Sequence, residues 1–166
     1  GNLAANSGVA AINLSGAGGE NEIKTTGGTG NIALGAIGNS GTASDLIVTT
    51  AAGTTSGDIT LNGDVTGVGY VTVNAGSTTS GNTGDVAINA DVTAGDANGG
   101  IGIDIDATND VTIAGTLTTT DGGTALDVDI DAGNEFTLSS GGIDSDNDIF
   151  ITASANDVNL AAGLTA

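Results

Sequence analysis

The stretch Asp110–Asn134, DVTIAGTLTTTDGGTALDVDIDAGN, carries the pattern that decides the fold. It begins with an acidic residue followed by apolar, any and apolar residues (110–113). A single apolar residue, Leu117, follows in a run of threonines, and a segment in which every second residue is apolar (126–130) closes it. Period-two alternation is typical of strands with one buried face. The stretch therefore predicts three short strands separated by turns.

The same unit recurs along the whole chain. Its starts are AINL (Ala11), NIAL (Asn31), DITL (Asp58), DVAI (Asp85), DVTI (Asp110), EFTL (Glu135) and DVNL (Asp157). The intervals between starts are 20, 27, 27, 25, 25 and 22 residues. A unit this short cannot bury its own inward face, so it must stack on its neighbours. The repeat predicts a parallel β-solenoid with three short strands per coil and about six coils of 20 to 27 residues.

Stacking should align like residues in inward files. The first file is expected to contain Ile12, Ile32, Ile59, Val86, Val111, Phe136 and Val158, and the file beside it Leu14, Leu34, Leu61, Ile88, Ile113, Leu138 and Leu160. The chain has no proline, which suits strands that donate every backbone N–H to a neighbouring coil. An antiparallel β-sandwich also uses short alternating strands, but the 20 to 27 residue self-similarity favours the solenoid.

Composition narrows the possible partners. Lys24 is the only basic residue and faces 20 acidic ones, for a formal net charge of −19, so we expect no nucleic-acid partner and an affinity for cations. No apolar run approaches the roughly 20 residues of a membrane helix, so no membrane insertion is expected. Residues 1–166 are predicted to form one solenoid domain. Because the chain contains no methionine, we expect it to be a processed product or a segment of a longer repetitive protein.

Two stretches carry a resemblance to a known class of proteins. GDITLNGDVTGVGYVTVNAG (57–76) and NDVTIAGTLTTTDGGTALDVDIDAGN (109–134) resemble the repetitive shafts of filamentous-haemagglutinin-like adhesins and autotransporter passengers. The resemblance extends over nearly the whole chain and rests on pattern and composition. It implies a right-handed β-helix, secretion to the surface of a bacterium, and adhesive or scaffolding work.

Four aspartates form the candidate metal site. Counting back from each repeat start pairs Asp104 with Asp129 and Asp106 with Asp131 on neighbouring coils. Carboxylates about 5 Å apart repel by roughly 1 kcal/mol in a watery setting and by more where the effective dielectric is low. A calcium ion that takes six to eight oxygen ligands would offset this repulsion. We therefore expect calcium to bridge the pairs and stiffen the rod.

A structural interpretation of the acidic residues competes with calcium. One file of carboxylates is predicted at the corner that enters the first strand, formed by Asp58, Asp85, Asp110, Glu135 and Asp157. Corner aspartates commonly accept hydrogen bonds from nearby backbone N–H groups and so hold turns. Outward aspartates also keep strand-rich rods from associating sideways. For the corner file the structural interpretation is favoured.

Catalysis is not expected. The chain has no His, Cys or Arg, and its three aromatic residues are spread too widely to build a sugar platform. The predicted function is a non-catalytic, extracellular structural segment of a filament or adhesin shaft that associates with itself head to tail through its coil ends. The alternative is a module that binds a host or surface glycan, or a receptor, through loops such as GSTTSGNTG (76–84) and the loop at 51–57.

Overall fold

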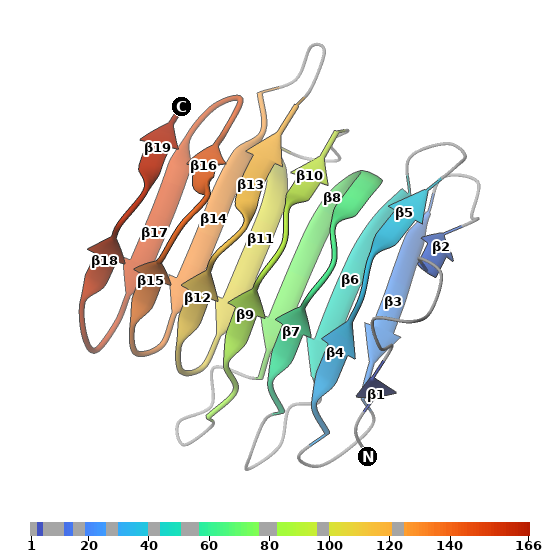
Figure 1. Cartoon of the computed structure of the whole chain (residues 1–166), viewed down its shortest axis with the longest axis horizontal. Coiled ribbons are helices and arrows are strands. Elements are labelled where there is room, and N and C mark those ends of the chain that lie inside the picture. The colour runs from blue at the N-terminus through green and yellow to red at the C-terminus, as the bar shows by residue number, and fades with distance from the viewer. Residues whose placement is uncertain are drawn as a thin grey trace.

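The chain is a right-handed parallel β-solenoid (Figure 1). The computed structural model describes residues 3–4, 12–14, 19–25, 30–39, 44–50, 57–76, 83–95, 100–120 and 125–166. Every strand pairing in this part of the chain is parallel, and no helix occurs in it. The predicted fold class is confirmed, and the sandwich alternative is wrong because no antiparallel pair is present among the described strands.

Each coil has three strand positions. First-position strands are β1 (Leu3–Ala4), β4 (Ile32–Leu34), β7 (Ile59–Leu61), β9 (Val86–Ile88), β12 (Val111–Ile113), β15 (Phe136–Leu138) and β18 (Val158–Leu160). The second position holds β2 (Ile12–Leu14), β5 (Ile37–Asn39), the start of β8 (Val65–Ala75), β10 (Val92–Ala94), β13 (Thr116–Thr119), β16 (Gly142–Asp144) and β19 (Gly163–Thr165). At the third position lie β3 (Glu20–Lys24), β6 (Ser44–Thr50), the end of β8, β11 (Ile101–Ala107), β14 (Asp127–Ala132) and β17 (Ile149–Ala153). The described chain thus passes through six such coils and ends on two strands of the next.

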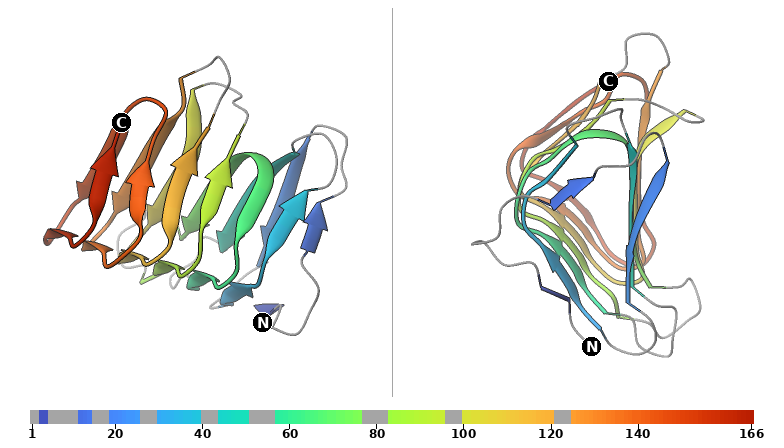
Figure 2. Two further views of the ribbon diagram at one scale, coloured as in Figure 1. Left: turned by 45° about the horizontal axis from the view of Figure 1, so that its top comes forward. Right: turned by 90° about the vertical axis from the view of Figure 1, so that its right-hand side faces the viewer.

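The handedness follows from the course of the chain in the figures. In Figure 1 first- and second-position strands such as β4 and β5 rise in front, and third-position strands such as β6 descend behind them, while the chain advances from right to left. Seen from the N-terminal end, as on the right of Figure 2, this path runs clockwise and away from the viewer. That course is right-handed.

β8 joins the two sheets that the second and third positions would otherwise form separately. It spans both positions without a loop, so the strands form one twelve-stranded sheet beside the seven-stranded sheet of the first position. The chain bends within β8 at Gly67, whose φ of 70° lies in the region that favours glycine. A Cβ there would also approach the Asn39 carbonyl oxygen to 2.8 Å, so both backbone angle and space require glycine.

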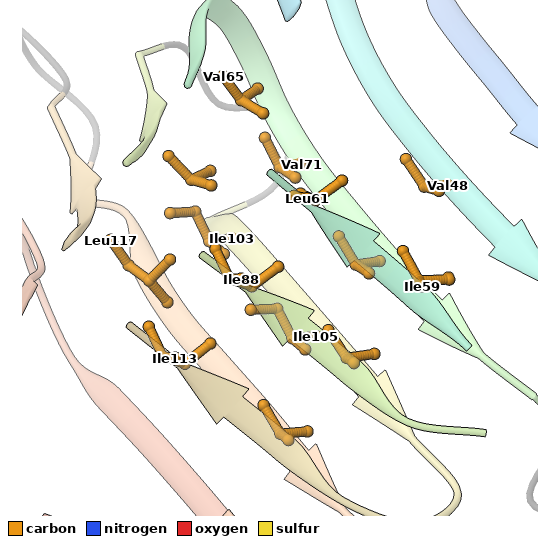
Figure 3. Packing of buried hydrophobic residues seen from close by; sticks show 14 of the residues in the cluster. Val48, Ile59, Leu61, Val65, Val71, Ile88, Ile103, Ile105, Ile113 and Leu117 are labelled. Carbon is orange, nitrogen blue, oxygen red and sulfur yellow. The ribbon is translucent and has the colours of Figure 1, made fainter. Parts of the chain in front are cut away.

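The core consists of aliphatic files. From Ile32 to Leu138 the two first-position files are fully buried, with no side chain more than 1% exposed. Figure 3 shows side chains of facing strands, such as Leu61 and Val71, meeting in the interior. Complete burial of an aliphatic side chain stabilises by about 1.5–3 kcal/mol. The repeated files therefore hold neighbouring coils together along the rod.

The first coil differs from the prediction. β2 pairs with β5 in the register Ile12↔Ile37, so Ile12 and Leu14 belong to the second position. The first-position strand of this coil is β1, in the register Leu3↔Ile32. The first interval therefore runs from residue 3 to residue 32 and is 29 residues, not 20. The error arose because every strand position shares the apolar–any–apolar pattern, so the pattern alone does not identify the position.

Candidate functional site

The four predicted aspartates lie on the outer face of the third-position strands β11 and β14 of the twelve-stranded sheet. β11 and β14 pair in the register Asp104↔Asp129 and Asp106↔Asp131, which confirms the predicted pairing. Inward residues of these strands, such as Ile105 and Ile130, are buried. Because side chains alternate along a strand, the aspartates project to the other side. We call these four residues the carboxylate face.

The carboxylate face has few hydrogen-bond donors around it. On the neighbouring coil, Asn74 donates from Nδ2 to Oδ2 of Asp106 at 3.1 Å. The register also places Thr72 beside Asp104, and on the other side Phe150 beside Asp129. The only basic residue, Lys24, lies on β3 and pairs with Glu22 at 2.6 Å. The acidic pairs therefore have no cationic side chain next to them in the described part of the sheet.

This environment raises three pKa values. The pKa of Asp104 rises from 3.8 to about 6, first because the side chain is half-buried and then because Asp106, Asp129 and Asp131 repel a second charge. Burial followed by Asp131 and Asp129 raises the pKa of Asp106, although the Asn74 amide opposes this. Burial followed by Asp131 and Asp127 raises the pKa of Asp129. Asp104, Asp106 and Asp129 therefore hold protons more tightly than isolated carboxyls do.

The geometry of the face does not complete a metal site. Among the residues that the structure describes, no group of three or more His, Cys, Asp or Glu side chains is arranged to hold an ion. The carboxylates instead form two pairs, Asp104 with Asp129 and Asp106 with Asp131, and we call each pair a rung of the carboxylate face. An ion bridging one rung would take its remaining oxygens from water or from another molecule. Calcium binding by Asp104, Asp106, Asp129 and Asp131 stays a prediction.

The corner file has a clear structural role. Oδ1 of Asp58 accepts the backbone N–H of Asp85, Oδ1 of Asp85 accepts that of Asp110, and Oδ1 of Asp110 accepts that of Glu135, each at 3.2 Å. In return, the backbone oxygen of each later residue accepts an N–H from the earlier coil, as Asp85 does from Ile59 at 2.9 Å. Each corner aspartate is therefore bonded to the next coil. We call this repeated arrangement the corner ladder.

The same arrangement occurs at the other two corners. At the entry to the second position, Oδ1 of Asp64 accepts the N–H of Asp91 at 3.3 Å, and Oδ1 of Asp91 accepts that of Thr116 at 2.8 Å. At the entry to the third position, Oδ1 of Asp127 accepts the N–H of Asp148 at 3.1 Å. In every case the carboxylate belongs to the earlier coil and the N–H to the later one. The corner bonds are thus directional along the rod.

Asparagines beside the corner acids were missed in the sequence. Asn109 donates from Nδ2 to Asp85 at 2.7 Å, Asn134 to Asp110 at 2.6 Å, and Asn147 to Asp127 at 2.6 Å. These amides stabilise the charged carboxylates at these corners through charge-assisted hydrogen bonds. A sequence signal for them exists, since asparagine precedes the acid in the dipeptides 109–110, 134–135, 147–148 and 156–157.

Glu135 interrupts the corner ladder. Its carboxylate carries one more methylene than aspartate and turns to Thr137 and Asn159, whose side chains donate to Oε1 at 3.0 and 3.1 Å. The backbone N–H of Glu135 still donates to Asp110. Only the hydrogen bond between the carboxylate at this corner and a backbone N–H of the next coil is replaced. The corner at β15 is consequently held by side chains across the strand pair β15 and β18.

The loops predicted to bind a glycan or receptor lie largely outside the described residues. These are residues 51–56 of the 51–57 loop and residues 77–82 of the 76–84 loop. The described part of the chain contains no helix long and apolar enough to cross a membrane.

Comparisons of the chain with models of protein families, with curated proteins and with solved structures give no match. The resemblance to adhesin shafts therefore rests on the repeat pattern and the composition alone.

Proposed function

We propose that the chain is a non-catalytic structural rod that serves as a segment of an extracellular filament or adhesin shaft. The observation that carries the proposal is the corner ladder, which recurs at all three corners and joins one coil to the next by side-chain hydrogen bonds. A rod that bears load or spans distance needs such joints repeated at every coil, because its coils contact only their neighbours.

The exterior supports the same role. The acidic surface, with a net charge of −19, disfavours sideways association of strand-rich rods. The absence of His and Cys removes the usual base of a catalytic triad and the thiol nucleophile, and the absence of Arg removes a common binder of anionic substrates. Extracellular location rests on the resemblance of the repeats to secreted adhesin shafts.

Two further elements belong to this proposal. Calcium would bridge the rungs of the carboxylate face and relieve their repulsion. The rod would extend by stacking of coil ends, since β17, β18 and β19 each end a sheet path and have one hydrogen-bonded neighbour. Aliphatic side chains are exposed there, with Val158 at 44% and Leu160 at 49%.

The cellular location of the chain and the shape of the particles that it forms test the proposal together. Intact cells that produce the chain are labelled with antibodies raised against it, and a cytoplasmic protein serves as the leakage control. Material sheared from the same cells is then viewed by negative-stain microscopy with antibody decoration. We expect surface labelling and straight decorated rods or fibres. Labelling that requires permeabilised cells would refute the extracellular role.

An exchange of residues 77–82 for a Gly/Ser sequence separates the shaft from the binding module. If the chain serves as a shaft, cells that carry the exchanged loop should attach to their surface as well as wild-type cells do. Loss of attachment, with rods still visible, would favour the alternative of a glycan- or receptor-binding module.

A further inference from the structure

Asn62 and Gly63 form an asparagine–glycine dipeptide at a corner of the rod, between β7 and β8. The Asn62 side chain is exposed and follows directly after the buried Leu61. In such a dipeptide the backbone nitrogen attacks the side-chain amide more readily than in others, because glycine has no Cβ to shield that nitrogen. The other asparagine–glycine dipeptide of the sequence, 98–99, lies outside the described residues. Asn62 is therefore the described residue with the strongest chemical tendency to deamidate.

The close approach of neighbouring coils explains why glycine follows Asn62. A Cβ on Gly63 would lie 2.2 Å from the backbone nitrogen of Ala36 on the previous coil, so a larger residue here would force the backbone to move. The same place on the next two coils holds Asn-Ala (89–90) and Ala-Gly (114–115). Among these three coils, only residues 62–63 combine asparagine with glycine.

Hydrogen bonds fix this corner to the coil before it. Asn62 donates its backbone N–H to the Leu34 oxygen at 2.8 Å. The backbone oxygen of Asp64 accepts the N–H of Ile37, also at 2.8 Å. The residues on both sides of Gly63 are thus bonded to the previous coil.

Hydrogen bonds also fix the corner to the coil after it. Asn89 donates its backbone N–H to the Leu61 oxygen at 2.8 Å and its side-chain Nδ2 to Oδ1 of Asn62 at 3.0 Å. Oδ1 of Asp64 accepts the N–H of Asp91 at 3.3 Å. The next coil therefore holds the backbone before Asn62, the Asn62 side chain and the residue after Gly63.

These contacts protect the dipeptide in the folded rod. The attack closes a ring of Cα, Cβ, Cγ and the carbonyl carbon of Asn62 with the Gly63 nitrogen, so the chain has to fold back on the Asn62 side chain. The hydrogen bond from Asn89 holds that side chain toward the next coil. A chain that folds back also moves Asp64 away from its partners on both coils. The reaction therefore requires the corner to separate from its neighbours.

We propose that Asn62 is a deamidation site that reacts only when its corner of the rod opens. The deprotonated Gly63 nitrogen attacks Cγ of Asn62, a C–N bond forms, and the side-chain nitrogen leaves as ammonia. Water then adds to one of the two carbonyl groups of the cyclic imide and opens it to aspartate or to isoaspartate. Water is the only co-reactant, so the step needs no enzyme. The proposal goes beyond the structural role of the rod and does not depend on its location.

The two products differ in their effect on the rod. Aspartate at this position keeps an oxygen for the Asn89 amide and leaves the backbone unchanged. Isoaspartate carries the backbone through Cβ and Cγ, which adds one methylene between the hydrogen bonds to Leu34 and Ile37. The corner has no space for the added length, since even a Cβ on Gly63 would lie 2.2 Å from a backbone nitrogen. An opened corner that forms isoaspartate therefore does not close again, and this limits the lifetime of the rod.

Site-resolved mass spectrometry of the full 166-residue chain tests the proposal. Wild type is kept at mildly alkaline pH in buffer and in a denaturant that unfolds it, and deamidation at Asn62 is followed over time. We expect the reaction to be at least about tenfold slower in buffer, because its rate follows the fraction of open corners. In denaturant, residues 62–63 and 98–99 should react at similar rates. Asn62→Gln is the control and should not deamidate at this position in either condition.

Two variants of the next coil test whether opening controls the reaction. Ile88→Ala removes a buried side chain that pairs with Leu61, and it should speed deamidation in buffer about tenfold or more. It should leave the rate in denaturant unchanged. Thr93→Ala changes an outward residue of the same coil and should leave both rates nearly unchanged.

Refolding tests the fate of the products. Protein aged in denaturant is returned to buffer, and size-exclusion chromatography separates the compact from the unfolded fraction. Isoaspartate, detected by a methyltransferase that modifies isoaspartyl groups, should be concentrated at position 62 in the unfolded fraction, whereas Asn62→Asp should refold as wild type does. Equal rates of deamidation in buffer and in denaturant would overturn the protection by the neighbouring coils. No reaction at Asn62 in denaturant would refute the site, and equal amounts of isoaspartate in both fractions would refute its effect on closure.

Discussion

Asp104 and Asp129 lie directly opposite each other in the register of β11 and β14, and both carboxyls have raised pKa values. The carboxylates of the corner ladder, by contrast, accept backbone N–H groups of the next coil. The two sets of acidic residues therefore have opposite effects on the stability of the rod. Those of the carboxylate face oppose folding when charged, and those at the corners stabilise the coils.

The first prediction concerns pH. Folding raises the pKa of Asp104 from 3.8 to about 6, so the folded chain binds the proton more tightly than the unfolded chain does. The contribution of Asp104 to stability is therefore greatest below its unfolded pKa near 4, is lost as pH rises through about 6, and is absent at pH 7. We expect Asp104 to account for on the order of 1 kcal/mol of this loss, because its partial exposure screens the repulsion.

Thermal melts at pH 4.5 and pH 7 check this expectation. The melting temperature of wild type should be higher at pH 4.5, and Asp104→Asn should reduce the difference by raising the midpoint at pH 7. Asp146→Asn is the matched control, since it removes the same charge from an exposed corner. An equal effect of both substitutions would assign the pH dependence to net charge instead of the carboxylate face.

The second prediction concerns the corner ladder. Asp85 accepts the N–H of Asp110 and the side-chain amide of Asn109, so Asp85→Ala leaves two donors without their acceptor. We expect a loss of about 1–3 kcal/mol in the free energy of unfolding, measured by denaturant titration. Asp85→Asn keeps Oδ1 and should cost less than half as much. Equal stability of wild type and Asp85→Ala would show that the ladder does not hold the coils.

The sequence predicted the aspartate pairs because the spacing is conserved between neighbouring coils. Asp104 to Asp129 spans 25 residues, as does Val111 to Phe136, so one correct register implies the other. In the first coil the prediction was wrong. Ile12 has the same apolar–any–apolar neighbourhood in the second strand position as Ile32 has in the first, and only pairing reveals the difference.

The corner ladder was only partly predictable. Asp58 and Asp85 were expected to hold turns, but aspartate in a sequence does not show which N–H it accepts. The donor proved to lie one coil away, 27 residues along the chain, instead of in the same turn. Likewise, the sequence does not show that the longer side chain of Glu135 accepts a hydrogen bond from the Asn159 amide on the next coil.

The third prediction concerns the aliphatic files. Ile88 is fully buried between β7 and β12, and Ile88→Ala should cost about 2–5 kcal/mol through lost burial and the cavity left behind. Leu160 occupies the same file on the last coil but is 49% exposed, so Leu160→Ala should cost less than half as much. Denaturant titration of both variants makes the comparison. Equal costs would contradict the burial of the file in the middle of the rod.

The fourth prediction concerns close approach of neighbouring coils. A Cβ on Gly115 would lie 2.0 Å from the backbone oxygen of Ala90 on the previous coil, a distance that requires the backbone to move. We expect Gly115→Ala to destabilise the rod by about 1–3 kcal/mol through overpacking. Gly38→Ala is the control, because no atom of the described residues, apart from its two chain neighbours, lies within 4 Å of its Cβ position. Unchanged melting of Gly115→Ala would mean that the coils are spaced more loosely at this corner.

The fifth prediction concerns calcium at the carboxylate face. An ion that bridges Asp104 and Asp129, or Asp106 and Asp131, would offset repulsion that is already visible in the raised pKa of Asp104. At pH 7 and low salt, calcium should therefore raise the melting temperature above that in chelator, by more than NaCl of matched ionic strength does. The double variant Asp104→Asn/Asp129→Asn should lose most of this gain, because one rung no longer carries charge. Magnesium should give a smaller gain, since it demands stricter octahedral geometry and releases water reluctantly. Equal melting temperatures in calcium and in chelator would refute calcium binding at the carboxylate face. Protonation would then be the means by which the repulsion between its carboxylates is relieved.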